Sequence, residues 1–303
     1  MLRLLQSNQP AAWVFVPLTA VLLWGISAMG RGAVPGGEEA LAFAGILASS
    51  RTIHLAHLES RMRTRPTSFP GWVFVLWAVP LISGYPIRLC WSGFFVLVGL
   101  RFALRLSEEE ARRNQALFWM GVSLGTAGVL WHSMSVWSLL LPLGCLGLRP
   151  FRAAETLSLL LGLVASWGFC LALPWLLRVP FPFVQAPSGM HWADWTALWF
   201  WMPAGVIGWL LRQKSLARAT ARQRLARRLT QWMSAAGLGL TFLFGLGGVG
   251  TQWSILAVFG GALFCTWTVG WCLPPSWKGT PWVPWCLLTL ALFSAALNMV
   301  PRW

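Results

Sequence analysis

Four polar residues at the end of one apolar segment have the types and the spacing that a proton or ion site requires. Arg51, His54, His57 and Glu59 follow the apolar run at residues 40–49 and continue the same predicted helix. His54 and His57 are three positions apart, so they share one face of that helix. Ionisable groups at membrane depth point to function. The alternative is a helix end that leaves the membrane, with Arg51 extending its head group toward the interface.

A second pair with chemical potential lies in the loop at residues 178–195. His191 and Asp194 are three positions apart, close to the start of a predicted helix. Three prolines exclude a regular helix at the start of this loop, and its Phe and Trp content favours the membrane interface. We predict that the loop lies on the periplasmic side, where the pair would contact a ligand. The alternative is an interfacial loop in which Asp194 caps the following helix.

A third group is the basic stretch at residues 212–228, which holds seven of the 23 Lys and Arg residues and no acid. Lys214, Arg218 and Arg222 recur at every fourth position, which is helical spacing. We predict a cytoplasmic helical loop that extends the preceding helix or lies on the membrane surface. Such clusters attract anionic lipid headgroups at about 1 kcal/mol per basic residue. Docking of an acidic cytosolic partner through Arg218 and Arg222 is the alternative.

The elements that position these residues follow from the composition. Only 10% of the residues are charged, 57% are hydrophobic, and the mean hydropathy is +0.63. A soluble domain carries about 25% charged residues. The chain is therefore predicted to be one all-helical membrane domain over residues 1–303. The net charge of +15 is explained by basic residues retained in cytoplasmic loops, so no nucleic-acid partner is predicted.

Eleven apolar segments are predicted to be transmembrane helices, and ten is the main alternative count. A perpendicular span needs about 20 residues, so the third and the sixth segments are short; they either thin the bilayer locally or lie behind longer neighbours. The segments are 12–29, 38–56, 70–84, 89–105, 114–131, 134–148, 154–177, 193–211, 229–246, 252–272 and 282–299.

The distribution of the basic residues supports this segmentation. If the N-terminus is cytoplasmic and the segments alternate, all but four of the 23 basic residues lie on the cytoplasmic side. The four exceptions are Arg31, Arg88, Arg178 and Arg302. Basic residues accumulate in cytoplasmic loops. The pattern therefore predicts a cytoplasmic N-terminus and a C-terminus outside.

Contacts between the helices can also be predicted. Arg101 and Arg105 are expected to meet the acidic residues at 108–110, which would join two helices, and Glu155 is expected to pair with Arg152. The ninth and tenth segments are rich in glycine, which allows membrane helices to approach closely.

No pattern that carries a cofactor or a named reaction occurs in the chain. Nucleotide loops, zinc-protease, serine-hydrolase and haem-attachment motifs are missing, and the six cysteines form no CxxC pair. No metal, cofactor or catalytic residue is therefore predicted, and the pattern disfavours an enzyme.

The stretch Leu148-Arg149-Pro150-Phe151-Arg152-Ala153-Ala154-Glu155 and the apolar run after it resemble an uncharacterised family of polytopic inner-membrane proteins from Bacteroidota. The Leu100–Leu106 stretch and the opening of the first segment are also similar to that family. The resemblance covers about the first 175 residues, and Ala153 and Ala154 depart from its pattern. It implies a Gram-negative inner membrane and brings no activity.

Three functions remain, in order of preference. The first is a non-enzymatic subunit or scaffold of an inner-membrane complex for envelope biogenesis, export or motility, with other membrane subunits as partners. The second is a transporter or flippase of a lipid or lipid-linked glycan, in which basic residues hold phosphate. The third is a metal-independent glycan polymerase or transferase that uses His191 and Asp194.

Overall fold

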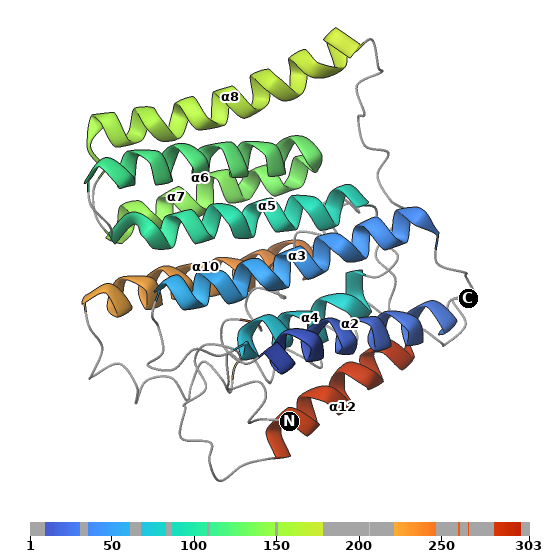
Figure 1. Ribbon diagram of the computed structural model, residues 1–303. Coiled ribbons are helices and arrows are strands. Elements are labelled where there is room, and N and C mark those ends of the chain that lie inside the picture. Colours follow the sequence, from blue (N-terminus) through green and yellow to red (C-terminus); the bar gives the residue numbers. More distant parts are fainter. Residues whose placement is uncertain are drawn as a thin grey trace.

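The computed structural model of the protein describes residues 10–30, 36–60, 68–82, 87–107, 110–148, 151–177, 206, 221–246, 260, 266 and 282–297. All regular elements within these ranges are helical, which confirms the predicted all-α class for this part of the chain. The helices are long rods stacked into one bundle (Figure 1).

The nine α-helices in the described ranges correspond to nine of the eleven predicted segments. They are α2 (Pro10–Gly30), α3 (Gly37–Ser60), α4 (Phe69–Ile82), α5 (Ile87–Leu104), α6 (Glu110–Leu130), α7 (Val136–Leu148), α8 (Ala153–Leu177), α10 (Ala221–Leu246) and α12 (Trp282–Leu297). The eighth and tenth predicted segments, at 193–211 and 252–272, lie almost wholly outside the described residues.

The start of α10 corrects one prediction about the basic stretch. Residues 221–228 belong to the same helix as the ninth predicted segment, whereas we expected them to extend the eighth segment or to lie on the membrane surface. Ala, Arg, Gln and Leu, the residue types at these positions, all favour helix. The basic residues here therefore lie on a rod that continues into the bundle.

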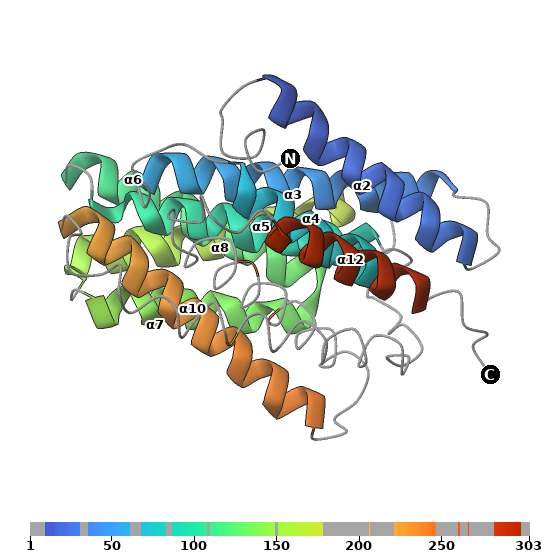
Figure 2. The same ribbon diagram turned by 90° about the horizontal axis from the view of Figure 1, so that it is seen from below.

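The short helix α4 lies at the centre of one half of the bundle. It has 14 residues, and its hydrophobic side chains from Phe69 to Val79 are at most 4% exposed. It is enclosed by α2, α3 and α12, and α12 lies over it in Figure 2. The sequence left two alternatives for this short third segment. In the structure it lies behind longer neighbours. Trp72 and Trp77 are fully buried within it.

The tightest helix pair is α6 with α8, which run in the same direction. Gly121 and Gly125 on α6 lie against the turns of α8 that contain Gly162 and Ser166. A Cβ atom at Gly162 would lie 3.0 Å from the amide nitrogen of Val122, so the two backbones are in contact. Small residues four positions apart permit this close approach of two helices. The spacing is visible in the sequence, although it was not among the predicted contacts.

The glycine-rich ninth and tenth segments approach each other closely at one position. Gly237 on α10 and Gly260 approach so closely that a Cβ on Gly260 would lie 2.6 Å from the Gly237 carbonyl oxygen. A different contact holds α10 to α7, where the Trp232 indole covers Gly144. The indole N–H of Trp232 donates a 2.8 Å hydrogen bond to the carbonyl of Leu140.

Charged residues gather at one end of the bundle, where α3 and α5 end and α6, α8 and α10 begin (Figure 1). The described residues at this end are Glu59, Arg101, Arg105, Arg112, Arg113, Arg152, Glu155, Arg224, Arg227 and Arg228. The guanidinium of Arg113 lies 3.9 Å from the carboxylate of Glu155, which links α6 to α8. This arrangement agrees with the predicted segregation of basic residues between the two ends. We call it the basic end.

One described helix, α5 at Ile87–Leu104, is by itself long and apolar enough to cross a membrane. Shorter apolar stretches that fall below that length are Val14–Met29, Phe69–Pro80 and Ala153–Phe169. The helices α3, α6 and α10 are long but carry charged residues in their terminal turns. Helix length and composition in the described residues therefore do not support eleven spans directly.

The α6–α8 contact predicts the effect of adding one methyl group. Gly162→Ala should lower the free energy of unfolding by about 1–3 kcal/mol, because the new carbon overlaps the backbone of α6. Gly168→Ala is the matched control on the same helix, since nothing lies within 4 Å of its Cβ position. The measurement is thermal unfolding of the purified protein in detergent. Equal effects of the two substitutions would contradict the backbone contact.

Candidate functional site

The polar face of α3 lies where the sequence predicted a proton or ion site. His54 and His57 are 5% and 2% exposed, and Arg51 is exposed. The prediction that one helix continues through all of these residues is confirmed, because α3 ends only at Ser60. Thr52 donates to the carbonyl of Ala48, so its hydroxyl is satisfied within the helix.

Arg51 and His54 line a pocket of about 170 Å³ between α2, α3 and the start of α4. The other lining residues are Val16, Pro17, Leu47, Ser50, Ser68 and Gly71. His57 is not among them, so the structure brings only one of the two predicted histidines into this pocket. We call this space the α3 pocket. Ser68 and Gly71 were not among the predicted site residues, although a serine directly before an apolar helix is a recognisable start signal.

The pocket exists because α4 begins far from the basic end. The hydroxyl of Ser50 donates a 2.9 Å hydrogen bond to the carbonyl of Gly71, which sets the start of α4 level with Ser50. A Cβ on Gly71 would lie 2.8 Å from the Ser50 carbonyl oxygen, so only glycine fits here. From Ser50, α3 continues for about 15 Å to Ser60, at about 1.5 Å per residue. The start of α4 is thus recessed beneath the last turns of α3.

The end of α3 is fixed by an ion-pair cluster. The carboxylate of Glu59 accepts hydrogen bonds from Nε of Arg101 and Nε of Arg105, both at 2.9 Å, and from the Nη2 atoms of the two guanidinium groups. Arg101 and Arg105 are four positions apart at the end of α5 and its 3-10 extension, Arg105–Ser107. We call these three residues the Glu59 clamp. It joins α3 to α5.

The Glu59 clamp corrects a prediction. Arg101 and Arg105 were expected to meet the acids at 108–110, but their carboxylate partner comes from another helix, at residue 59. Residues 108 and 109 lie outside the described residues. Helix packing decided the pairing, because α3 and α5 lie side by side along their length. The arginines were expected to join α5 to α6, whereas the Glu59 clamp joins α3 to α5.

The environment of Glu59 favours its charged form. Burial alone would raise the pKa of Glu59, but the hydrogen bonds from Arg101 and Arg105 and the charges of both arginines hold the pKa below its ordinary value. The side chain of Glu59 is 25% exposed and the arginines are 27% and 31% exposed, so solvent screens the cluster only in part. Two cations share one carboxylate here.

Glu155 has a structural role at the start of α8. Its carboxylate accepts a 3.1 Å hydrogen bond from the backbone N–H of Arg152, directly before the helix. This is the side-chain half of a capping box, in which the third residue of a helix satisfies the N–H of the capping residue. The predicted pairing of Glu155 with Arg152 therefore involves the backbone N–H of Arg152. The guanidinium that approaches the Glu155 carboxylate comes from Arg113 instead.

The remaining predicted contacts fall outside this region. His191, Asp194 and Arg218 lie outside the described residues, as does the whole loop at 178–195. Arg222 belongs to the first turn of α10. Predictions for these residues remain predictions.

The chemistry that the α3 pocket offers is recognition of an anion. Arg51 supplies a guanidinium, His54 an imidazole, and the start of α4 supplies the positive end of a helix dipole. No set of three His, Cys, Asp or Glu side chains within the described ranges is arranged to hold a metal ion. The rest of the wall is mostly apolar, apart from Ser50 and Ser68. The pocket can thus hold a small anionic group that is attached to an apolar body.

No protein-family model, curated protein or solved structure matches the chain.

The Glu59 clamp predicts how stability depends on pH. A carboxylate whose pKa is lowered in the folded protein contributes stability above its unfolded pKa and loses that contribution as pH falls through the folded value. Glu59→Gln should cost about 1–3 kcal/mol at neutral pH, because a neutral amide replaces charge-assisted hydrogen bonds. The difference in Tm between the wild type and Glu59→Gln should shrink as the pH falls below about 4.5, the ordinary pKa of glutamate. A difference that stayed constant down to about pH 3 would contradict the charged clamp.

Proposed function

We propose that the chain is a multi-pass protein of the bacterial inner membrane with about eleven spans, a cytoplasmic N-terminus and a periplasmic C-terminus. It serves as a non-enzymatic subunit or scaffold of a membrane complex. The observation that carries the proposal is that large apolar side chains are exposed on the outer faces of α2 and α8.

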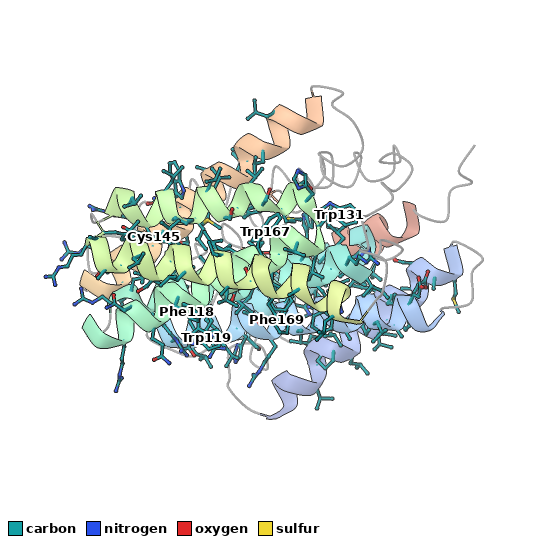
Figure 3. All side chains as sticks on the ribbon, turned by 90° about the horizontal axis from the view of Figure 1, so that it is seen from above. Phe118, Trp119, Trp131, Cys145, Trp167 and Phe169 are labelled. Atoms are coloured by element: carbon teal, nitrogen blue, oxygen red, sulfur yellow. The ribbon has the colours of Figure 1, made fainter. Side chains whose placement is uncertain are left out.

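Helix α8 carries the clearest example of this outer surface. Large apolar side chains recur on its open side at spacings of three and four, and they are 50–67% exposed; they are Leu157, Leu160, Leu161, Val164 and Phe169. Figure 3, which looks onto α8, shows this side with no other helix above it. The inward side of α8 is also apolar, as at Leu159, which is 6% exposed. A helix that is apolar all round needs an apolar environment on its open side.

The same pattern recurs at the opposite edge of the bundle. Val14, Leu18, Val21, Leu22 and Met29 on α2 are 50–80% exposed. Soluble proteins rarely expose contiguous apolar patches larger than a few hundred Å². Hydrocarbon around both edges, with the basic end in the cytoplasm, accounts for these surfaces and for the distribution of the charges.

The subunit role is supported by the kind of packing that holds the bundle together. The α6–α8 contact is made by backbone atoms, the Ser92 hydroxyl donates a 2.8 Å hydrogen bond from α5 to the carbonyl of Ala127 on α6, and Trp91 donates to Leu41 across α5 and α3. These contacts favour one fixed arrangement of helices. Four indoles on the outer surface are 40–57% exposed and offer amphipathic contacts to lipid or to neighbouring subunits; they are Trp119, Trp167, Trp232 and Trp285.

Partners follow from the same surfaces. Anionic lipid headgroups are proposed at the basic stretch, including Arg218 and Arg222, and other membrane subunits at the apolar faces. The second function, a transporter or flippase of a lipid or lipid-linked glycan, is favoured by one observation, the α3 pocket with Arg51 and His54. The third, a glycan transferase, depends on His191 and Asp194.

Cysteine labelling in cells tests the proposed topology. In a variant whose native cysteines are replaced, Arg112→Cys and Arg228→Cys at the basic end should react with an impermeant maleimide only after the membrane is opened. Glu38→Cys and His132→Cys, at the other ends of α3 and α6, should react in intact cells. Labelling of Arg112→Cys and Arg228→Cys from opposite faces would overturn the arrangement, as would a protein that stays in solution without detergent.

Copurification tests the subunit role. After solubilisation in a mild detergent, the tagged chain should retain stoichiometric membrane partners. A photocrosslinking residue at Leu160 or Val164, both on the open side of α8, should capture a partner, whereas the same residue at the buried Leu159 should not. A chain that purifies alone and crosslinks only to lipid from every exposed face would contradict the proposal.

A further inference from the structure

The wall of the α3 pocket has a polar side whose groups already have partners. The hydroxyl of Ser50 donates to the carbonyl of Gly71, and Arg51, His54 and Ser68 each interact with other groups of the protein. A ligand therefore gains new contacts chiefly on the other side of the wall, where the side chains are apolar. These side chains are Val16, Pro17 and Leu47.

The space exists because the residues where α3 meets the start of α4 are small. Ser50, Ser68 and Gly71 carry no side chain large enough to fill it. Its volume of about 170 Å³ is similar to that of an apolar cavity of about 150 Å³ that binds benzene. Side chains that border an empty space lose dispersion contacts, which a hydrocarbon group in that space restores.

The depth of the pocket identifies the hydrocarbon that is available to it. From Glu59 at the basic end, Arg51 and Leu47 lie about 12 Å and about 18 Å along α3, at about 1.5 Å per residue. The hydrocarbon core of a bilayer is about 30 Å thick within a total of about 40–45 Å. In the proposed membrane location, the apolar wall of the pocket therefore lies at the level of the lipid acyl chains.

The apolar wall also reaches the outer surface of the bundle. Val16, Pro17 and Leu47 are half-buried rather than enclosed. On either side of Pro17, Leu18 and Val21 are 55% and 50% exposed, and their spacing of three places them on neighbouring turns of one face of α2. An acyl chain that lies along this face of α2 can turn its end into the pocket.

We propose that the α3 pocket holds a segment of an acyl chain from a membrane phospholipid. The chain contacts Val16 and Pro17 on α2 and Leu47 on α3, and it fills the junction of α2, α3 and α4 as a structural lipid. The hydrocarbon carries this site, whichever headgroup is joined to it. The inference rests on the proposed membrane location and does not depend on the subunit role.

Photolabelling of the purified full-length chain in nanodiscs tests the proposal, with a phosphatidylcholine that carries a diazirine in its acyl chain as the probe. Irradiation should attach lipid to Val16 and Pro17, as mapped by peptide mass spectrometry. Leu47→Trp fills the space without changing any charge and should reduce these adducts about tenfold, because the chain loses its apolar surroundings. Adducts at the exposed Leu18 should not change, since surrounding lipid reaches that side chain in both proteins.

The matched control is Leu161→Trp, the same substitution on the open side of α8, where Leu161 is 54% exposed. It should leave the adducts at Val16 and Pro17 as they are in the wild type. An equal loss in this variant, or adducts that Leu47→Trp does not reduce, would overturn the site. If Leu47→Trp does not fold, Val16→Trp fills the pocket from α2, and the adducts are then measured at Pro17 and Leu47.

Two further probes separate the chain from other ligands. Phosphatidylglycerol with the same photoreactive chain should give equal adducts, and labelling by phosphatidylglycerol alone would make the headgroup the ligand and overturn the proposal. Labelling by a photoreactive fatty alcohol where neither phospholipid labels would overturn it in favour of a free chain. The assay uses the isolated chain, so a failure to find partner subunits leaves its result unchanged, whereas a chain that stays in solution without detergent would show that the membrane location itself is wrong.

Discussion

The arrangement of the bundle depends on α4, which is too short to reach from one end of the bundle to the other. At 14 residues, α4 is about 21 Å long, and its apolar side chains are buried on every side. Longer helices must therefore enclose it, which α2, α3 and α12 do. Because α4 starts level with Ser50, the last turns of α3 stand clear of it, and Arg51 and His54 line the space that remains. The α3 pocket is a consequence of this mismatch in length.

Several hydroxyl groups inside the bundle donate hydrogen bonds to the nearest backbone carbonyl. The hydroxyls of Thr19, Ser49 and Ser234 donate to carbonyls one turn earlier in their own helices. Where two helices meet, a hydroxyl donates across the interface instead, as Ser92 does from α5 to α6. These bonds matter because a buried polar group without a partner costs free energy. The partly buried carboxylate of Glu59 is held by two arginines instead.

Local features of the fold were predictable, whereas partners distant in the sequence were not. The run of apolar residues and the continuing helix through Arg51 predicted α3, since both depend on neighbours within a few positions. The partner of Arg101 was predicted wrongly because acids at 108–110 are close in sequence, while Glu59 becomes close only when α3 packs on α5. The role of Gly71 needs knowledge of which backbone approaches it, and that knowledge comes only from the structure. Gly121 and Gly125, by contrast, carried a readable spacing.

The packing beyond the α3 pocket bears on the proposed alternative of a transporter. Directly after Gly71, Trp72 is fully buried, its indole N–H approaches the hydroxyl of Thr19 at 3.4 Å, and its ring contacts Phe15. The residues of α4 from Val73 to Val79 then fill the space between α2, α3 and α12. Passage along this route would require α2 and α4 to separate and would leave the Trp72 indole without its partner. The packing is therefore better suited to holding α2, α3 and α4 against one another than to providing a route through the bundle, which agrees with the proposed role of a subunit.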